Sequence, residues 1–180
     1  TVVLVGMLMI ILSPRSGIVN NVIKMFGGEP IFFMADPKLF KSIYVWSGIW
    51  QNTGWSSIIY MAALAGVDTE IYEAATVDGA NKLKRIWYID LPMLVPTIVI
   101  LFIMNMGNMM SVGFEKVYLM QNSLNINASE VVSTYVYKSG LQSTEFSFSA
   151  AVGLFNSVIN LVLLISVNTI SKRVSDMGLW

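Results

Sequence analysis

Long apolar runs alternate with polar segments along this chain, and the runs are close to the length of a membrane crossing. A helix needs about 20 mainly apolar residues to cross the hydrocarbon layer of a bilayer. Three runs, residues 43–66, 94–113 and 148–170, reach this length, although a short polar stretch interrupts the first of them. The pattern therefore predicts an all-α integral membrane protein with three complete spans.

The first apolar run, residues 1–12, is too short to cross a membrane by itself. It has neither the basic flank nor the small-residue cleavage site of a signal peptide. We interpret it as the end of a span that begins upstream. The sequence is thus expected to be truncated at the N-terminus and to hold part of one span besides the three complete ones.

Polar segments connect the runs. Residues 13–42 contain Gly27, Gly28, Pro30 and Pro37, which are turn and breaker residues, so a long loop is predicted there. Residues 114–147 mix tyrosines with polar residues, as expected of an interfacial helical segment, and residues 171–180 form a tail. Lys and Arg are divided almost evenly between the polar segments on the two sides of the membrane. The distribution of positive charge therefore does not indicate the orientation of the chain.

Composition agrees with a membrane protein and excludes several other classes. Hydrophobic residues make up 55% of the chain, charged residues only 12%, and the mean hydropathy is +0.65. The formal net charge is zero and no basic run occurs, which argues against a nucleic-acid partner. The chain has neither Cys nor His, so no metal site, thiol nucleophile or imidazole base is predicted.

The segment EAATVDGA, residues 73–80, places charged and small residues between the first two complete spans. Asp68 can cap a helix that starts near Thr69, since its carboxylate can accept a hydrogen bond from a free backbone N–H group. Gly79 is the residue type that accepts a left-handed conformation at the end of such a helix. A short helix followed by a turn is therefore predicted.

A second helix is predicted to restart at Ala80, supported by an Asp78–Lys82 ion pair. It should stop before Pro92, because the residue before a proline disfavours the helical conformation. Residues 67–93 would then form a helix, turn, helix element outside the membrane. Composition alone favours a simpler interpretation, a polar connector, since EAA and DGA are common strings.

Spacing over the longer stretch EAATVDGANKLKRIWYIDLP changes this balance. It resembles the loop motif of the permease subunits of bacterial binding-protein-dependent ABC importers. The downstream stretches STYVYKSG and FSFSAAVGLFNSVINLVLLISVN are similar to the polysaccharide and aldouronate permeases of the LplB group. The resemblance implies a MetI-like ABC permease helical core. The residues that match the loop motif are Glu73, Ala74, Ala75, Gly79, Ile89, Leu91 and Pro92.

The resemblance implies that residues 67–93 are a cytoplasmic coupling loop, which docks on an ATP-hydrolysing partner subunit. Residues 13–42 and 114–147 would then be external and residues 171–180 a cytoplasmic tail. Glu73 would meet a basic group on the partner, Ala74 and Ala75 would allow close approach, and Gly79 would form the turn. The residues expected to couple the two subunits are Glu73, Ala74, Ala75, Asp78 and Gly79.

The same resemblance implies the function and the partners. The expected function is the permease subunit of an ATP-driven importer of oligosaccharides or other carbohydrates in the bacterial plasma membrane, crossing it several times. Expected partners are a second, different permease, two ATP-binding subunits and an extracytoplasmic solute-binding lipoprotein. ATP and Mg²⁺ would lie on the partner ATPase, because this chain has no GXXXXGK[ST] run and catalyses no reaction itself.

A sugar path needs aromatic faces for the apolar side of a pyranose ring and amides for its hydroxyl groups. We predict that Trp50, Gln51, Asn52, Trp55 and Asn108 line it, by analogy with related permeases. Polar residues in membrane helices also serve simply to join neighbouring helices. That alternative is preferred for the Gly and Asn stripe of the last span, which consists of Gly153, Asn156, Ser157 and Asn160.

Three other functions remain as alternatives. An ion-coupled secondary transporter usually carries Asp, Glu or His at membrane depth, and the three predicted spans contain none. An intramembrane enzyme would need a base beside its serine nucleophile, and the spans offer neither His nor Lys. A membrane scaffold subunit that does not transport would differ from a permease in an uptake assay on a deletion strain.

Overall fold

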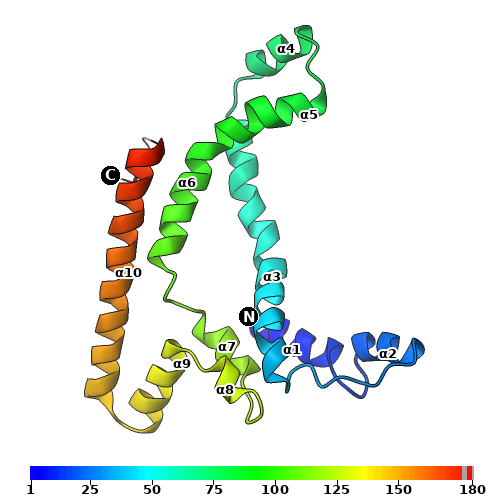
Figure 1. Ribbon diagram of the computed structural model, residues 1–180, viewed down its shortest axis with the longest axis vertical. Helices are drawn as coiled ribbons and strands as arrows, with labels where there is room; N and C mark the ends of the chain where they lie inside the picture. Colours follow the sequence, from blue (N-terminus) through cyan, green and yellow to red (C-terminus); the bar gives the residue numbers. More distant parts are fainter. Residues whose placement is uncertain (176–177, 180) are drawn as a thin grey trace. The chain divides into compact units, whose positions relative to one another are not determined.

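The structure, a computed structural model, describes residues 1–175, 178 and 179 and is built from helices (Figure 1). No β-strand occurs among these residues, in agreement with the predicted all-α class. In chain order the elements are α1 (Val2–Ile11), α2 (Ile18–Met25), α3 (Pro37–Ala65), α4 (Thr69–Val77), α5 (Lys82–Arg85), the π-helical turn η1 (Ile86–Asp90), α6 (Leu91–Gly107), α7 (Phe114–Met120), α8 (Ile126–Ser129), α9 (Val132–Tyr137), the π-helical turn η2 (Lys138–Gln142) and α10 (Phe146–Ser175).

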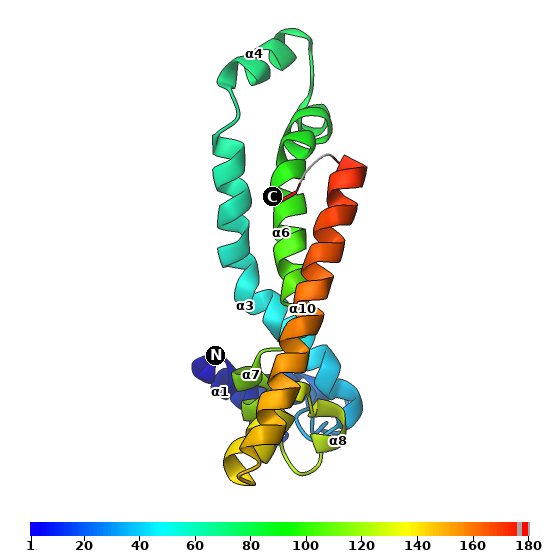
Figure 2. The ribbon, with the colours of Figure 1, turned by 90° about the vertical axis from the view of Figure 1, so that its left-hand side faces the viewer.

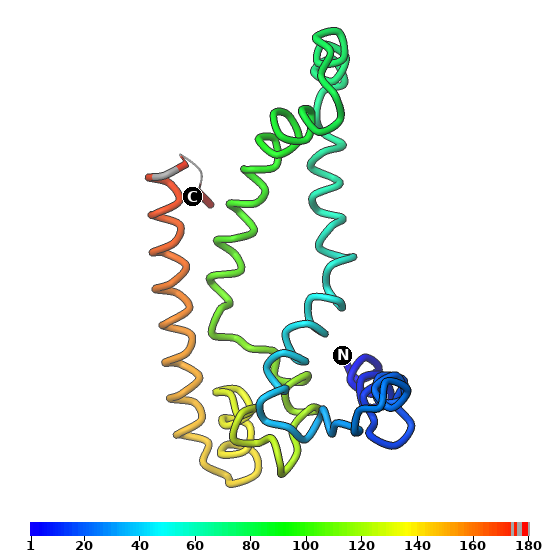
Figure 3. Tube along the Cα trace, turned by 45° about the vertical axis from the view of Figure 1, so that its right-hand side comes forward, coloured from blue at the N-terminus to red at the C-terminus, as the bar shows by residue number. Residues whose placement is uncertain are grey.

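The chain folds as two compact units, each made of two separate stretches that can be followed by colour in Figure 3. Unit 1 consists of Thr1–Gln51 and Ser111–Ser157, and unit 2 of Asn52–Met110 and Val158–Trp180. Unit 1 therefore holds the short helices α1, α2 and α7 to α9. Unit 2 holds α4, α5 and α6 together with the C-terminal parts of α3 and α10.

Two helical stretches are long and apolar enough to cross a membrane by length and composition, Lys82–Gly107 and Phe146–Arg173. They correspond to the second and third predicted spans. Helix α3, which contains the predicted span 43–66, has 29 residues and exceeds the required length. It is less apolar because the polar stretch QNT, residues 51–53, lies in its middle. Helix α1 has ten residues and is too short to cross.

The predicted loop at residues 13–42 is wrong in part, because it contains α2 and the beginning of α3. Pro37 is the first residue of α3, where its missing N–H group costs nothing. The Asp36 carboxylate accepts a hydrogen bond from the Lys38 N–H group at 2.8 Å and so caps the helix. Pro37, which the sequence pattern predicts to be a breaker, is thus the start of a helix. This helix begins six residues before the predicted span.

The predicted stop before Pro92 is also wrong, because the helix continues from Lys82 through η1 into α6. Inside an α-helix, a proline ring collides with the carbonyl group four residues earlier. Here the Leu91 N–H group bonds to the Ile86 carbonyl five residues back, and this wider turn just before Pro92 accommodates the ring. At its other end α6 stops at Gly107, earlier than the predicted residue 113.

Helix α10 extends the predicted span 148–170 at both ends, and its C-terminal turns include Lys172 and Arg173. The predicted tail at residues 171–180 is therefore helical as far as Ser175, while residues 176, 177 and 180 lie outside the described part of the chain. Within unit 2, α6 and α10 come into close contact. A Cβ atom on Gly107 would lie 2.7 Å from Leu164 Cδ1, so a larger residue here would force the Leu164 side chain to move.

Asn160 supports the packing interpretation of the polar stripe on α10. Its Oδ1 atom accepts a hydrogen bond from the Met110 N–H group at 3.1 Å, just beyond the end of α6. A side chain of one helix thus satisfies a backbone donor beside the end of another. This is the helix-joining role expected of a membrane asparagine.

Unit 1 has a small apolar core made of Val5, Phe40, Val117 and Met120, which come from α1, α3 and α7. Lys116 lies beside it and is only 7% exposed. Its Nζ atom donates to the Tyr44 carbonyl at 3.1 Å and lies 4.9 Å from the centre of the Tyr44 ring. Desolvation lowers the pKa of Lys116 below its ordinary value, because burial disfavours the charged form.

Candidate functional site

Helix α4 lies beyond the end of α3 in unit 2 and runs across its direction (Figures 1 and 2). Its start is the predicted one: Asp68 is the N-cap, and its Oδ1 atom accepts a hydrogen bond from the Glu70 N–H group at 3.0 Å. Glu70 in the first turn places a negative charge near the positive end of the helix dipole. Two local interactions thus stabilise this short helix.

The end of α4 depends on Gly79, which has a φ angle of +71°. The Gly79 N–H group bonds to the Thr76 carbonyl at 3.1 Å, and the Ala80 N–H group bonds to the Ala75 carbonyl at 2.9 Å. This pair of bonds is a Schellman motif, which satisfies two carbonyl groups that the helix leaves free. The predicted left-handed glycine is therefore confirmed.

The coupling candidates lie on different sides of α4. Glu73 and Ala74 are exposed, and so are Asp78 and Gly79 at the turn, whereas Ala75 is half-buried. The structure therefore leaves Glu73 and Ala74 accessible to a partner and turns Ala75 towards the rest of the loop.

Sequence reasoning missed Val77, which is 88% exposed. It follows Glu73 by four positions and Ala74 by three, and such spacings place side chains on the same face of a helix. The outer face of α4 thus combines a carboxylate, a small residue and an apolar side chain. The signal for Val77 was its spacing from Glu73.

The predicted second helix of the loop begins later than expected. Its N-cap is Asn81, whose Oδ1 atom accepts a hydrogen bond from the Lys84 N–H group at 2.9 Å, and α5 starts at Lys82 instead of Ala80. Asp78 therefore lies outside this helix. The prediction of a helical Asp78–Lys82 pair is wrong, because the i, i+4 geometry needs both residues in one helix.

Two side-chain hydrogen bonds join α4 to the helix that follows. The Tyr72 hydroxyl donates to Asp90 Oδ1 at 2.7 Å, and Arg85 Nη1 donates to Thr76 Oγ1 at 3.5 Å. The hydrogen bond to Asp90 raises the pKa of Tyr72, with smaller contributions from desolvation and the negative charge of Asp90. The tyrosine therefore remains a protonated donor at neutral pH.

The predicted sugar-path residues lie on two helices. Trp50, Gln51, Asn52 and Trp55 follow one another along two turns of α3, and this chain leaves all four exposed, with Trp55 at 77%. Asn108 caps the C-terminal end of α6, and its Nδ2 atom donates to the Met104 carbonyl at 3.3 Å. Indole and amide groups are thus exposed on α3, and the Asn108 side chain stabilises the end of its own helix.

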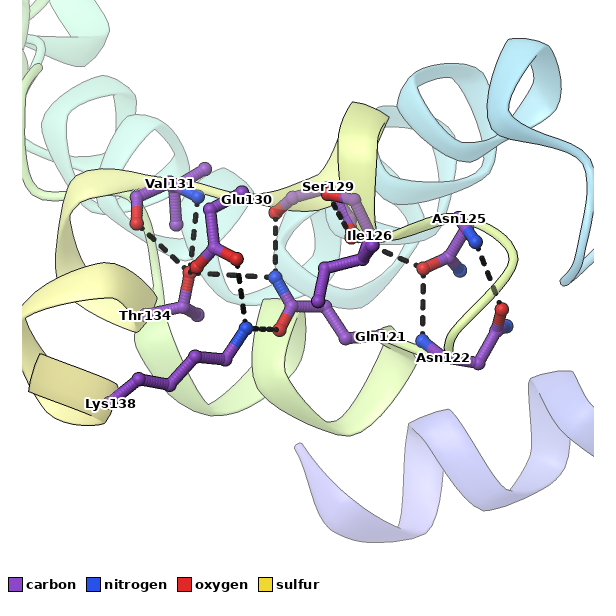
Figure 4. Close-up of polar contacts among 9 residues, drawn as sticks. All are labelled: Gln121, Asn122, Asn125, Ile126, Ser129, Glu130, Val131, Thr134 and Lys138. Carbon is purple, nitrogen blue, oxygen red and sulfur yellow. Dashed lines mark hydrogen bonds and ion pairs between the residues drawn. The ribbon is translucent and has the colours of Figure 1, made fainter. Parts of the chain in front are cut away.

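A polar cluster in unit 1 joins α7, α8 and α9 and was not predicted (Figure 4). Its centre is Asn125, which is fully buried. Asn125 Nδ2 donates to the carbonyls of Met34 at 2.9 Å and Met120 at 3.0 Å, while its Oδ1 atom accepts from the Asn122 N–H group and the Ser129 hydroxyl. One side chain thus fixes a loop from the first stretch of unit 1 onto α7 and α8.

At the edge of this cluster Lys138, the first residue of η2, bonds to the residues that directly follow α7 and α8 (Figure 4). Its Nζ atom lies 2.8 Å from Glu130 Oε2 and donates to Gln121 Oε1 at 3.1 Å. Partial burial alone would raise the pKa of Glu130, but hydrogen bonds from Lys138 and Thr134 and the charge of Lys138 outweigh it and hold the pKa below its ordinary value. The described residues include no group of three or more Asp, Glu, His or Cys side chains placed to hold a metal ion.

A family model described as "Binding-protein-dependent transport system inner membrane component" matches residues 1–176, nearly the whole chain. The chain belongs to this family. It is therefore a membrane protein and a component of transport systems that work with a binding protein, and the family is one of transport components and not of enzymes. The match confirms the predicted ABC permease resemblance and fold class.

One of two similar curated proteins is named for the transport of polysaccharides. The chain is 39% identical to the polygalacturonan/rhamnogalacturonan transport system permease protein YteP of Bacillus subtilis and 40% identical to the protein LplB of the same organism. Each alignment covers 99% of this chain and 56% of the relative. The chain thus spans little more than half the length of these relatives.

A solved structure has the same fold. It is the crystal structure of a bacterial alginate ABC transporter in complex with an alginate pentasaccharide-bound periplasmic protein. The match has a TM-score of 0.93 and 36% sequence identity, and it covers 99% of this chain and 62% of the other. This likeness confirms the predicted permease architecture for the part of the protein described here.

Proposed function

We propose that this chain is part of the permease subunit of an ATP-driven carbohydrate importer and that residues 67–93 couple transport to ATP hydrolysis in a partner subunit. The observation that carries the proposal is the construction of α4. It is capped at Asp68, closed by the Schellman motif at Gly79 and braced by Tyr72, while Glu73, Ala74 and Val77 are left exposed. A simple connector has no need of such an ordered, outward-facing helix.

The assembly follows from this function. The chain pairs with a second, different permease, and two ATP-binding subunits dock on the coupling loops of the pair. An extracytoplasmic solute-binding lipoprotein delivers the carbohydrate from outside. The helices cross the bacterial plasma membrane several times, and ATP with Mg²⁺ lies on the partner ATPase. The family description and the oligosaccharide-bound periplasmic protein of the matched transporter support the role of a binding protein in this arrangement.

Glu73→Ala tests the coupling role in the full-length protein assembled with its partners. We expect carbohydrate-stimulated ATP hydrolysis to fall about tenfold, because a charge-assisted contact contributes roughly 1.5 to 3 kcal/mol. Glu29→Ala is the matched control, since Glu29 is another exposed carboxylate but lies in the predicted external segment. Parental activity in Glu73→Ala, with the complex intact, would remove the main support for the importer function.

We further propose that Trp50, Gln51, Asn52 and Trp55 of α3, together with Asn108, line the sugar path. The indole and amide groups on α3 are exposed on this chain and suit pyranose rings.

Trp55→Ala should lower carbohydrate uptake about fivefold or more, as loss of an aromatic contact worth roughly 1 kcal/mol or more requires. Trp46→Ala, which removes an indole that is 70% exposed on the same helix, serves as the control. Unchanged uptake of every sugar tested in Trp55→Ala would contradict the path.

Two alternative functions make different predictions. A secondary transporter would move sugar without the ATP-binding subunits, in response to an ion gradient. A scaffold subunit would leave uptake unchanged when its coupling loop is altered. Uptake by proteoliposomes with and without internal ATP, measured for the parent and for Glu73→Ala, separates all three possibilities.

A further inference from the structure

Helix α4 is joined to its neighbours by short non-helical connections. Gly66, Val67 and Asp68 lead into it from α3, and residues 78–81 lead out of it towards α5. Such segments bend easily, because helical hydrogen bonds do not hold them along their whole length. A force applied to α4 by a partner would therefore be absorbed in these connections unless side chains tie the helix to the spans.

The Tyr72–Asp90 hydrogen bond is such a tie. It joins residues 18 positions apart, has a length of 2.7 Å, and both side chains are half-buried. Asp90 is the last residue of η1 and stands directly before Leu91, the first residue of α6. The bond therefore connects α4 with the beginning of a helix that can cross the membrane.

Other contacts between these elements are weaker. The Arg85–Thr76 hydrogen bond measures 3.5 Å and is exposed. A cavity of about 300 Å³ lies beside the tie and is lined by Leu64, Tyr72, Lys82, Arg85, Ile86 and Asp90. This pocket is open beside Tyr72 and Asp90, and the hydrogen bond between them is shorter than the Arg85–Thr76 bond that also joins α4 to the following helix.

We infer that Tyr72 and Asp90 form a latch that makes the coupling helix and the start of α6 move as one body, so that movement of the ATPase reaches the membrane-spanning helix. This inference rests on the proposed function of the loop. Tyr72 and Asp90 are positioning residues on this view: they touch neither sugar nor ATP, and act by holding α4.

The test is Tyr72→Phe in the full-length, reconstituted transporter, with the sugar imported per ATP hydrolysed as the readout. Phenylalanine keeps the ring and removes only the donor. We expect carbohydrate-stimulated ATP hydrolysis to persist while the sugar moved per ATP falls about tenfold or more, as loss of a hydrogen bond to a charged group predicts. Tyr88→Phe is the matched control, because Tyr88 is 80% exposed in the same segment.

Variants of Asp90 complete the test. Asp90→Asn keeps an acceptor oxygen and should import nearly as much sugar per ATP hydrolysed as the parent. Asp90→Leu removes the acceptor and should lower this ratio as much as Tyr72→Phe does. The double variant Tyr72→Phe, Asp90→Leu should be no worse than either single change, because both remove one shared interaction. Additive losses in the double variant would overturn the latch.

The failure of the latch can be told from failure of the proposed function. Tyr72→Phe could import as much sugar per ATP as the parent while Glu73→Ala loses carbohydrate-stimulated ATP hydrolysis. That result would overturn the latch and leave the proposed role of the coupling loop intact. Parental behaviour of both variants would overturn the proposed function as well. A merely structural role of Tyr72 would lower the amount of assembled complex and leave the ratio unchanged, which also contradicts the latch.

Discussion

Gly79→Pro is expected to reduce carbohydrate-stimulated ATP hydrolysis by the assembled transporter at least tenfold. Gly79 has a φ angle of +71°, whereas the proline ring holds φ near −65°. Proline also lacks the N–H group that bonds to the Thr76 carbonyl. The Schellman motif is lost, α4 unwinds at its C-terminal end, and the exposed face that carries Glu73 is displaced.

The control for this change is Gly79→Asn. Asparagine tolerates the left-handed conformation better than other residues with a side chain, and a Cβ atom at position 79 meets no other atom within 4 Å. We expect its activity to stay within about twofold of the parent. Equal loss in both variants would mean that the backbone conformation at this turn does not explain the effect, and a fully active Gly79→Pro would contradict the coupling role of α4.

Asn125→Ala is expected to have the largest effect on stability, lowering the free energy of unfolding by about 2 to 4 kcal/mol. The side chain is completely buried and bonds to two carbonyl groups, one N–H group and one hydroxyl. Alanine leaves several of these groups without a partner and away from water. The free-energy cost of such unsatisfied groups exceeds the net free energy that the hydrogen bonds contribute to stability. Thermal unfolding of the purified protein in detergent measures the change.

Asn127→Ala is the matched control, because Asn127 lies on α8, the short helix that directly follows Asn125, and its side chain is exposed. Its unfolding should differ from the parent by no more than about 0.5 kcal/mol. If the two alanine variants unfolded at the same temperature, the buried cluster would not stabilise unit 1 in the way described.

The coupling loop shows what local sequence rules can predict. The start of α4 at Asp68 and the left-handed glycine at its end were both predicted, since each depends on residues within one helical turn. The functional roles of Glu73 and its neighbours came from the resemblance to ABC permeases and remain a proposal. The spacing of Val77 from Glu73 places both on one helix face, but only the structure shows that Val77 is exposed there.

The errors have a common physical cause. The sequence pattern predicts a breaker at Pro37 and a helix stop before Pro92, but both residues lie within helices. A proline ends a helix only when the chain cannot supply a suitable geometry. At Pro37 the residue occupies a first turn, where no N–H donor is needed, and before Pro92 a π-helical turn removes the collision.

The sequence by itself determined the membrane class, the position of the long helices and the caps of α4, because apolar length and capping act over a few neighbouring residues. Only the tertiary structure decided the Tyr72–Asp90 bond and the bond between Asn125 and the Met34 carbonyl, which join residues 18 and 91 positions apart. Such pairs depend on the path of the backbone between the partners. Each polar side chain has many alternative partners in the sequence, and burial next to one of them makes the choice.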